Sequence, residues 1–103
     1  MAEADLAAAI EPFAEKPSSD GIAADGQGRV YITNVAENAI SIADATGTRI
    51  WAQDHRMVWP DGVYVAPDGS VVATINQLNR AASFNGGTSG AETPFLILRI
   101  QEE

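Results

Sequence analysis

Short apolar runs, separated by polar turn sequences, recur along the chain beyond residue 17. These runs are rich in Val, Ile, Tyr and Thr, and turn sequences such as Asp-Gly, Gly-Gln-Gly and Pro-Asp-Gly separate them. β-Branched and aromatic residues between such turns are typical of antiparallel strands. The pattern therefore predicts an all-β fold, with strands at 21–25, 29–34, 39–44, 49–53, 62–66, 70–76 and 95–100.

The N-terminal segment has a different pattern. Residues 3–10 read EADLAAAI, a run of good helix formers in which two large apolar residues lie one turn apart. Pro12 and Pro17 follow, and proline does not continue a helix. We therefore expect residues 1–17 to form a short helix or arm that precedes the strands.

The strand region contains an internal repeat with an offset of 41 residues, from Asp20 to Asp61. Residues 28–30 align with residues 69–71 at the same offset, without a gap. A period of about 40–50 residues with several short strands per unit is typical of β-propeller blades. The repeat predicts two four-stranded antiparallel blades of a six-bladed β-propeller, one at 18–58 and the other, which lacks its fourth strand, at 59–103.

Two blades do not close a ring, because a propeller needs about 4–8 of them. Each blade alone would expose an apolar face and a strand edge, which favours association. We therefore expect either the missing blades of a longer chain or a homo-oligomer. A trimer is favoured, because three copies of two blades would make a six-bladed ring with cyclic symmetry.

Composition narrows the possible classes of function. The chain has 6 Lys and Arg against 14 Asp and Glu, a formal net charge of −8, which argues against binding to the phosphate backbone of nucleic acid. It has no cysteine, so a thiolate zinc site and a cysteine nucleophile are excluded. The apolar stretch at residues 6–10 is too short to span a membrane, so we expect neither nucleic acid nor membrane as a partner.

Several segments together resemble a known family. They are Trp59-Pro60-Asp61-Gly62-Val63, ATINQLNR at 73–80, FNGG at 84–87, PFLILRI at 94–100, KPSSDGIA at 16–23 and ENAI at 37–40. Over about residues 16–100 the chain resembles the C-terminal blades of the major royal jelly protein/Yellow family, although the blades that normally precede Lys16 are absent. The resemblance implies a six-bladed propeller that is exported, hence extracellular or periplasmic. It also implies a small ligand, such as an amine, bound in the central channel.

A more distant similarity runs to the senescence-marker/gluconolactonase (SMP-30-like) propellers. In those lactonases an aspartate that matches this Asp-Gly position coordinates a divalent metal, and other blades supply the remaining ligands. The similarity implies an alternative function, a metal-dependent lactone hydrolase in which Asp20 or Asp61 is a ligand and a metal-activated water attacks. A third alternative is a structural fragment that assembles through its blade faces and has no activity.

Asp20 and Asp61 are the main candidate site residues, because each precedes the first strand of a predicted blade and would face the channel. Their carboxylates would bind a divalent cation such as Ca²⁺ or a cationic ligand. Alternatively, each Asp-Gly caps its turn through an Asx-type hydrogen bond. Asp25 and Asp68 lie in the following turns, where we expect a turn role alone.

Three further residues are candidate ligand contacts. Asn34 and Asn76 end the second strands, where their amide oxygens would accompany the carboxylates around a cation or satisfy local backbone groups. Arg80 lies in the long polar loop at 77–93, which would form either a flap over the channel or a mobile surface loop.

The one histidine and the two tryptophans lie near the connection between the predicted blades. His55 has no nucleophile motif around it, so we expect a surface or turn residue rather than a general base. Trp51 and Trp59 would fill the interface between blades or form an aromatic wall for a ligand.

Overall fold

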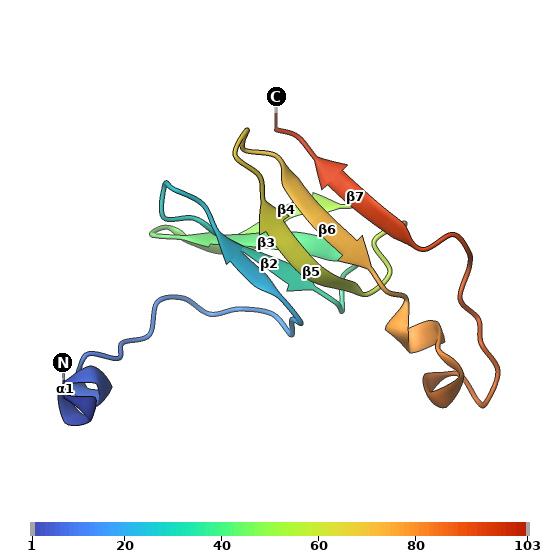
Figure 1. The fold of residues 1–103 in the computed structure, drawn as a ribbon, viewed down its shortest axis with the longest axis horizontal. Coiled ribbons are helices and arrows are strands. Elements are labelled where there is room, and N and C mark those ends of the chain that lie inside the picture. Colours follow the sequence, from blue (N-terminus) through green and yellow to red (C-terminus); the bar gives the residue numbers. More distant parts are fainter. Residues whose placement is uncertain (1, 103) are drawn as a thin grey trace.

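The protein, which a computed structural model describes from residue 2 to residue 102, is built around two antiparallel β-sheets (Figure 1). This arrangement confirms the all-β prediction, and each observed strand overlaps a predicted one. The first sheet has four strands in chain order: β1 (Ile22–Ala24), β2 (Val30–Asn34), β3 (Ala39–Asp44) and β4 (Gly47–Gln53). The second sheet has three: β5 (Pro60–Val65), β6 (Val71–Ile75) and β7 (Leu96–Ile100).

Two strands are longer than the sequence pattern predicts. β4 begins at Gly47, which pairs with Asp44 across a tight turn, and the φ of 122° at Gly47 is one that a residue with a side chain rarely adopts. β5 begins at Pro60, which pairs with Ile75 before the register shifts between Pro60 and Val63. Such irregularities are invisible to a pattern of period two, because they depend on the partner strand.

The helical structure of residues 2–102 consists of three short elements. The N-terminal helix α1 (Glu3–Ala8) ends earlier than the predicted residue 10. The long loop after β6, predicted to be irregular, contains two 3-10 turns, η1 (Leu78–Arg80) and η2 (Ala82–Phe84). In the part of the chain that the structure describes, no helix has the length and apolar character needed to cross a membrane.

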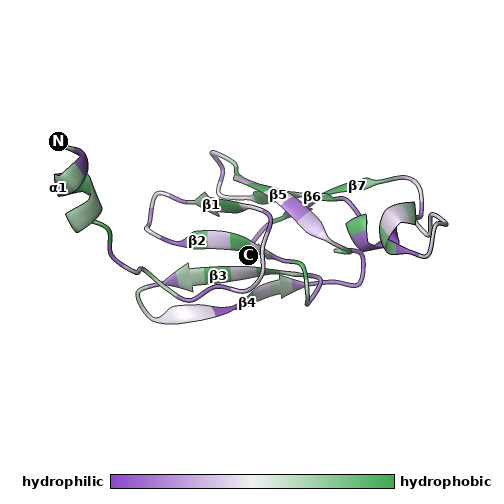
Figure 2. Ribbon diagram, turned by 90° about the horizontal axis from the view of Figure 1, so that it is seen from below, coloured by the Kyte–Doolittle hydropathy of each residue, from purple (hydrophilic) through white to green (hydrophobic). Residues whose placement is uncertain are grey.

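The core lies between the two sheets, which form separate layers in Figure 2. Every second side chain of a strand points to the same face, so each sheet turns one set of residues to the core. Trp51 is half-buried at its margin, where its ring meets that of Tyr31 edge-on with the centroids 5.0 Å apart. The buried residues of this core are Tyr31, Ile40, Ile42, Met57, Val71, Ala73 and Ile75.

The 41-residue repeat also appears in the hydrogen bonds. The Thr33 hydroxyl accepts the Gly21 N–H at 3.0 Å, and the Thr74 hydroxyl, 41 residues later, accepts the Gly62 N–H at 2.9 Å. Gly21 also lies directly against the second sheet, since a Cβ on it would overlap the carbonyl oxygen of Asp61. The sheets therefore approach closely where β1 and β5 begin.

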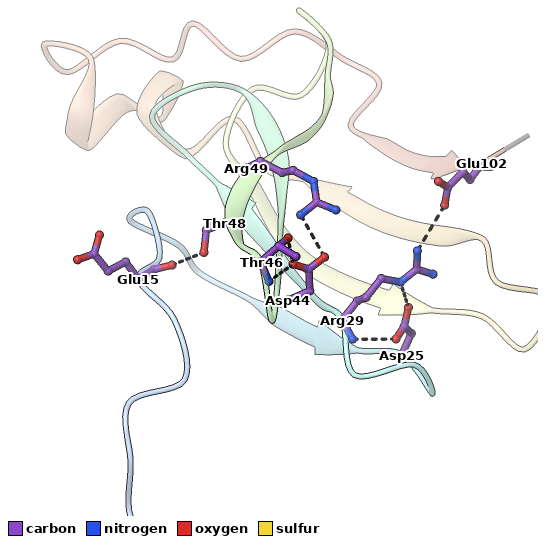
Figure 3. Close-up of polar contacts among 8 residues, drawn as sticks. All are labelled: Glu15, Asp25, Arg29, Asp44, Thr46, Thr48, Arg49 and Glu102. Carbon is purple, nitrogen blue, oxygen red and sulfur yellow. Dashed lines mark hydrogen bonds and ion pairs between the residues drawn. The ribbon is translucent and has the colours of Figure 1, made fainter.

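The N-terminal arm lies on the face of the first sheet opposite to the core. The Thr48 hydroxyl of β4 donates to the Glu15 carbonyl at 2.5 Å (Figure 3), and the Val35 N–H donates to the Ser18 carbonyl at 3.4 Å. Thr48 pairs with Ala43, and the side chains of this pair point away from the core. The arm thus covers a part of the first sheet that the second sheet does not reach.

Ion pairs stabilise the hairpins at the same end of the first sheet (Figure 3). Hydrogen bonds from the hydroxyl and backbone of Thr46, followed by Arg49, lower the pKa of Asp44 to about 2. Burial raises the pKa of Asp25, but hydrogen bonds from the backbone and side chain of Arg29 outweigh that effect, so the pKa is lowered. Arg29 also lies 3.8 Å from Glu102, just beyond β7, which links the two sheets.

Candidate functional site

Asp20 and Asp61 lie at the junction where the two sheets approach. Asp20 precedes Gly21, and Gly21 packs against the backbone of Asp61. The repeat therefore brings together two Asp-Gly turns that are 41 residues apart in the sequence. Asp20 is exposed and Asp61 is half-exposed, so both carboxylates are accessible to a ligand from solvent.

A neighbouring side chain holds each carboxylate by one oxygen. The indole N–H of Trp59 donates to Oδ2 of Asp20, which connects the two sheets. The Asn76 amide donates to Oδ2 of Asp61 at 2.5 Å. In residues 2–102 no hydrogen bond reaches Oδ1 of either carboxylate, so each keeps one oxygen for a ligand.

In the described residues, neither Asp20 nor Asp61 makes the Asx-type hydrogen bond that was the alternative to ligand binding. The Gly21 and Gly62 amides donate instead to the hydroxyls of Thr33 and Thr74. This leaves the Asp20 and Asp61 side chains available for other contacts, and it distinguishes them from the aspartates in the next turns.

Asp25 and Asp68 do make the expected turn contacts. Oδ1 of Asp25 accepts the Gln27 N–H at 2.8 Å, and Oδ1 of Asp68 accepts the Ser70 N–H at 2.9 Å. Hydrogen bonds from the Ser70 hydroxyl and backbone lower the pKa of Asp68. These two carboxylates stabilise the folded turns, as Asx turns do.

Two strained residues lie at this end of the second sheet. Trp59 and Gln77 have φ angles of 56° and 49°, in the left-handed region that residues with side chains rarely adopt. Trp59 is held by the Asn76 N–H, which donates to its carbonyl at 3.1 Å, and the Gln77 N–H donates to Val58 at 3.0 Å. With this left-handed backbone, Trp59 directs its indole N–H to the Asp20 carboxylate. Strained backbone conformations of this kind are often found at functional sites.

The other two candidate residues do not contact the carboxylates. Asn34 is buried, and its amide bonds the Ser41 hydroxyl and the Glu37 N–H, each at 3.2 Å, within the first sheet. Arg80 donates to Oε1 of Gln77 at 2.8 Å in the loop after β6. The structure thus brings Asp20, Asp61 and Asn76 to one junction and places Asn34 and Arg80 elsewhere.

His55 lies at the surface, as the sequence predicts, with 93% of its side chain exposed. Its Nδ1 is 3.5 Å from Asp54, which forms hydrogen bonds with Arg56. Those bonds to Arg56 hold the pKa of Asp54 well below its ordinary value. The one contact that His55 makes with a charged side chain in residues 2–102 is therefore to an acid that Arg56 already holds.

Sequence reasoning missed two contributors to this end of the sheet. Trp59 was expected to fill an interface or line a pocket, and its bond to Asp20 depends on a left-handed backbone that no sequence motif announces. Gln77 is buried and organises the loop after β6, yet an isolated glutamine gives no signal. The alignment of Thr33 with Thr74 at the repeat offset did contain the signal for the two threonine caps.

Neither the comparison with known proteins nor the search for metal-binding side chains assigns a ligand to this site. A scan against protein-family models found no match, and a search of curated proteins found no significant match. Between residues 2 and 102, no three His, Cys, Asp or Glu side chains gather closely enough to hold a metal ion. The side chains of Asp20, Asp61 and Asn76 at the sheet junction would supply part of the 6–8 oxygen ligands that Ca²⁺ usually takes.

Proposed function

We propose that the chain forms two neighbouring blades of a β-propeller of royal-jelly/Yellow type and binds a small, positively charged ligand where the blades meet. One observation carries the proposal: Asp20 and Asp61 occupy equivalent positions of the repeat on turns that approach each other, where Gly21 packs against the Asp61 backbone. Within residues 2–102, each carboxylate has one oxygen that accepts no hydrogen bond. The remaining blades would come from a longer chain or from further copies, with a trimer as the simplest closed ring.

The arrangement of the strands supports the propeller part of the proposal. Each sheet follows chain order, and β5 contacts β1 and β2, so the first strands of both units lie at the junction. The outer face of the second sheet exposes Tyr64 and Ile97. A further sheet against that face would remove these side chains from water, which is favourable at about 25 cal/mol per Å² of apolar area.

The chemistry of the junction supports a cationic ligand. An ammonium group between two carboxylates would make charge-assisted hydrogen bonds with both Oδ1 atoms. The formal net charge of −8 adds a field that draws cations to the surface.

Titration of the full chain with phenethylamine, followed by NMR, tests the ligand part. We expect binding that 2-phenylethanol, which has a similar shape without the charge, does not reproduce. Asp61→Asn should weaken amine binding by about tenfold or more, because a charge-assisted hydrogen bond contributes about 1.5–3 kcal/mol. Asp68→Asn is the matched control, since its carboxylate caps a turn in the same sheet. Equal binding of the amine and the alcohol would contradict the proposal.

Titration with calcium distinguishes the amine site from the alternative function, a metal-dependent lactone hydrolase. Calcium binding that disappears in Asp61→Asn, together with hydrolysis of a lactone by the calcium-loaded protein, would favour that alternative over an amine site. If neither calcium nor amine binds and Asp61→Asn only lowers stability, the third alternative, a purely structural unit, is correct.

A further inference from the structure

A pocket lies at the end of the second sheet where Trp59 and Gln77 have left-handed backbones. Its volume is about 260 Å³. Three segments line it: the connection before β5, the loop after β6, and the residues leading into β7. The lining residues are His55, Arg56, Val58, Gln77, Arg80, Glu92, Thr93, Pro94 and Leu96.

Arg80 differs from the arginines that make ion pairs in this structure. Arg29, Arg49 and Arg56 each contact a carboxylate. The only hydrogen bond of the half-buried Arg80 side chain within residues 2–102 goes to the neutral Oε1 of Gln77, at 2.8 Å. Its remaining donors meet no carboxylate among residues 2–102.

Gln77 fixes the position of that guanidinium. Its side-chain amide donates to the Glu92 carbonyl and its oxygen accepts the Glu92 N–H, both at 2.8 Å. The same oxygen accepts from Arg80. The two ends of the loop are thereby joined around a buried side chain, so Arg80 is positioned before any ligand arrives, which reduces the entropy lost on binding.

The rest of the pocket combines charge with an apolar wall. His55 and Arg56 line it together with Arg80, and Glu92, whose backbone is held by Gln77, lines it as well. Val58 is buried, and Leu96 is half-buried. The volume, about 260 Å³, is slightly below the range of about 300–1,000 Å³ for drug-sized ligands, so the pocket suits a ligand of a few carbon atoms.

We propose that this pocket binds a small organic monoanion, a carboxylate with a short apolar tail. The planar guanidinium of Arg80 matches a carboxylate with two parallel hydrogen bonds, and the tail packs against Val58 and Leu96. The site is independent of the amine site proposed above, because it uses different residues and selects the opposite charge.

NMR titration of the full chain with sodium hexanoate tests the proposal, with hexylammonium chloride as the probe of opposite charge. Hexanoate should shift the signals of Gln77, Arg80 and Leu96, and hexylammonium should leave them unchanged. Arg80→Gln should weaken hexanoate binding about tenfold or more. Arg99→Gln, which removes an equal charge from exposed β7, should leave it unchanged. Absence of hexanoate binding, or equal binding by wild type and Arg80→Gln, overturns the proposal.

A second variant is needed because Arg80→Gln removes the hydrogen bond to Gln77 and could disturb the loop itself. His55→Glu places a negative charge on the pocket rim at a side chain that is 93% exposed, so folding should be unaffected. Hexanoate binding should fall several-fold in this variant, and unchanged binding overturns the proposal. Because phenethylamine binding depends on Asp61, failure of the amine site and failure of this anion site are distinguishable.

Discussion

The two copies of the repeat present the same positions to different surroundings. Thr33 pairs with Ile40 in the first sheet, and Thr74 pairs with Ile97 in the second. Ile40 is completely buried, whereas Ile97 is 71% exposed. Register and side-chain direction match, so the difference arises from the neighbour: the second sheet covers the first, and nothing in residues 2–102 covers the outer face of the second. A repeat thus determines which face is apolar, and the adjacent layer decides whether that face is buried.

We expect the largest change in stability from truncation of Ile40, compared with truncation of Ile97 at the equivalent position of the second sheet. Ile40→Ala should lower the free energy of unfolding by about 2–5 kcal/mol, because it leaves a cavity between the sheets. Ile97→Ala should change it by less than about 0.5 kcal/mol, as an exposed site does. Urea denaturation at several protein concentrations measures both. A cost at Ile97 as large as that at Ile40 would show that another copy buries this face.

The equivalent glycines offer a second comparison. Gly21→Ala should destabilise the protein by about 1–3 kcal/mol, since the added methyl group overlaps the Asp61 carbonyl oxygen. Gly62→Ala should cost less, because its Cβ would meet only the Thr74 hydroxyl, at 3.1 Å. Thermal unfolding of both variants compares them. Equal losses of stability would indicate that a further unit packs on Gly62 as Asp61 packs on Gly21.

Assembly itself can be tested on the exposed face. If further copies complete the proposed ring, light scattering should give the mass of a trimer, and Ile97→Asp should shift that mass towards the monomer. The unfavourable term is the burial of an unpaired carboxylate in the new interface. Tyr64→Phe, which keeps the same face apolar, is the control. A monomer in the wild type would remove the trimer, leaving blades from a longer chain as the way to close a ring.

The smallest effect concerns acid stability of the β3–β4 hairpin, which has no counterpart in the described part of the second sheet. Hydrogen bonds from Thr46 lower the pKa of Asp44 from 3.8 to about 2 in the folded protein. A lowered pKa stabilises the fold above pH 3.8, and that contribution is lost as the pH falls towards about 2. Urea denaturation between pH 2 and pH 6 should therefore show a shallower acid dependence in Asp44→Asn. An unchanged slope would mean that Asp44 contributes nothing through its charge.

Local chemistry accounts for the parts of the structure that the sequence predicted. Runs of apolar and β-branched residues located the seven strands, and the Asp25-Gly26 and Pro67-Asp68-Gly69 turns located the β1–β2 and β5–β6 hairpins. These signals act over two to four residues, so they survive without knowledge of the fold. The two 3-10 turns after β6 have no such periodicity, and for that reason they were not predicted.

The candidate site was predicted only in part. The repeat indicated that Asp20 and Asp61 belong together, and Gly21 packs directly against Asp61. Asn34 looked equivalent to Asn76, but its amide is used within the first sheet. The Trp59–Asp20 contact joins residues from different sheets, so it depends on how the two layers pack.

The sequence by itself determined the strands, their two-sided pattern and the 41-residue repeat, because side-chain alternation and turn preference are properties of neighbouring residues. Only the tertiary structure decided which faces are covered, which carboxylate oxygens remain free and where Arg80 is held. These outcomes depend on contacts between segments far apart in the chain. Alternation alone assigns a residue to a face without specifying what lies against it.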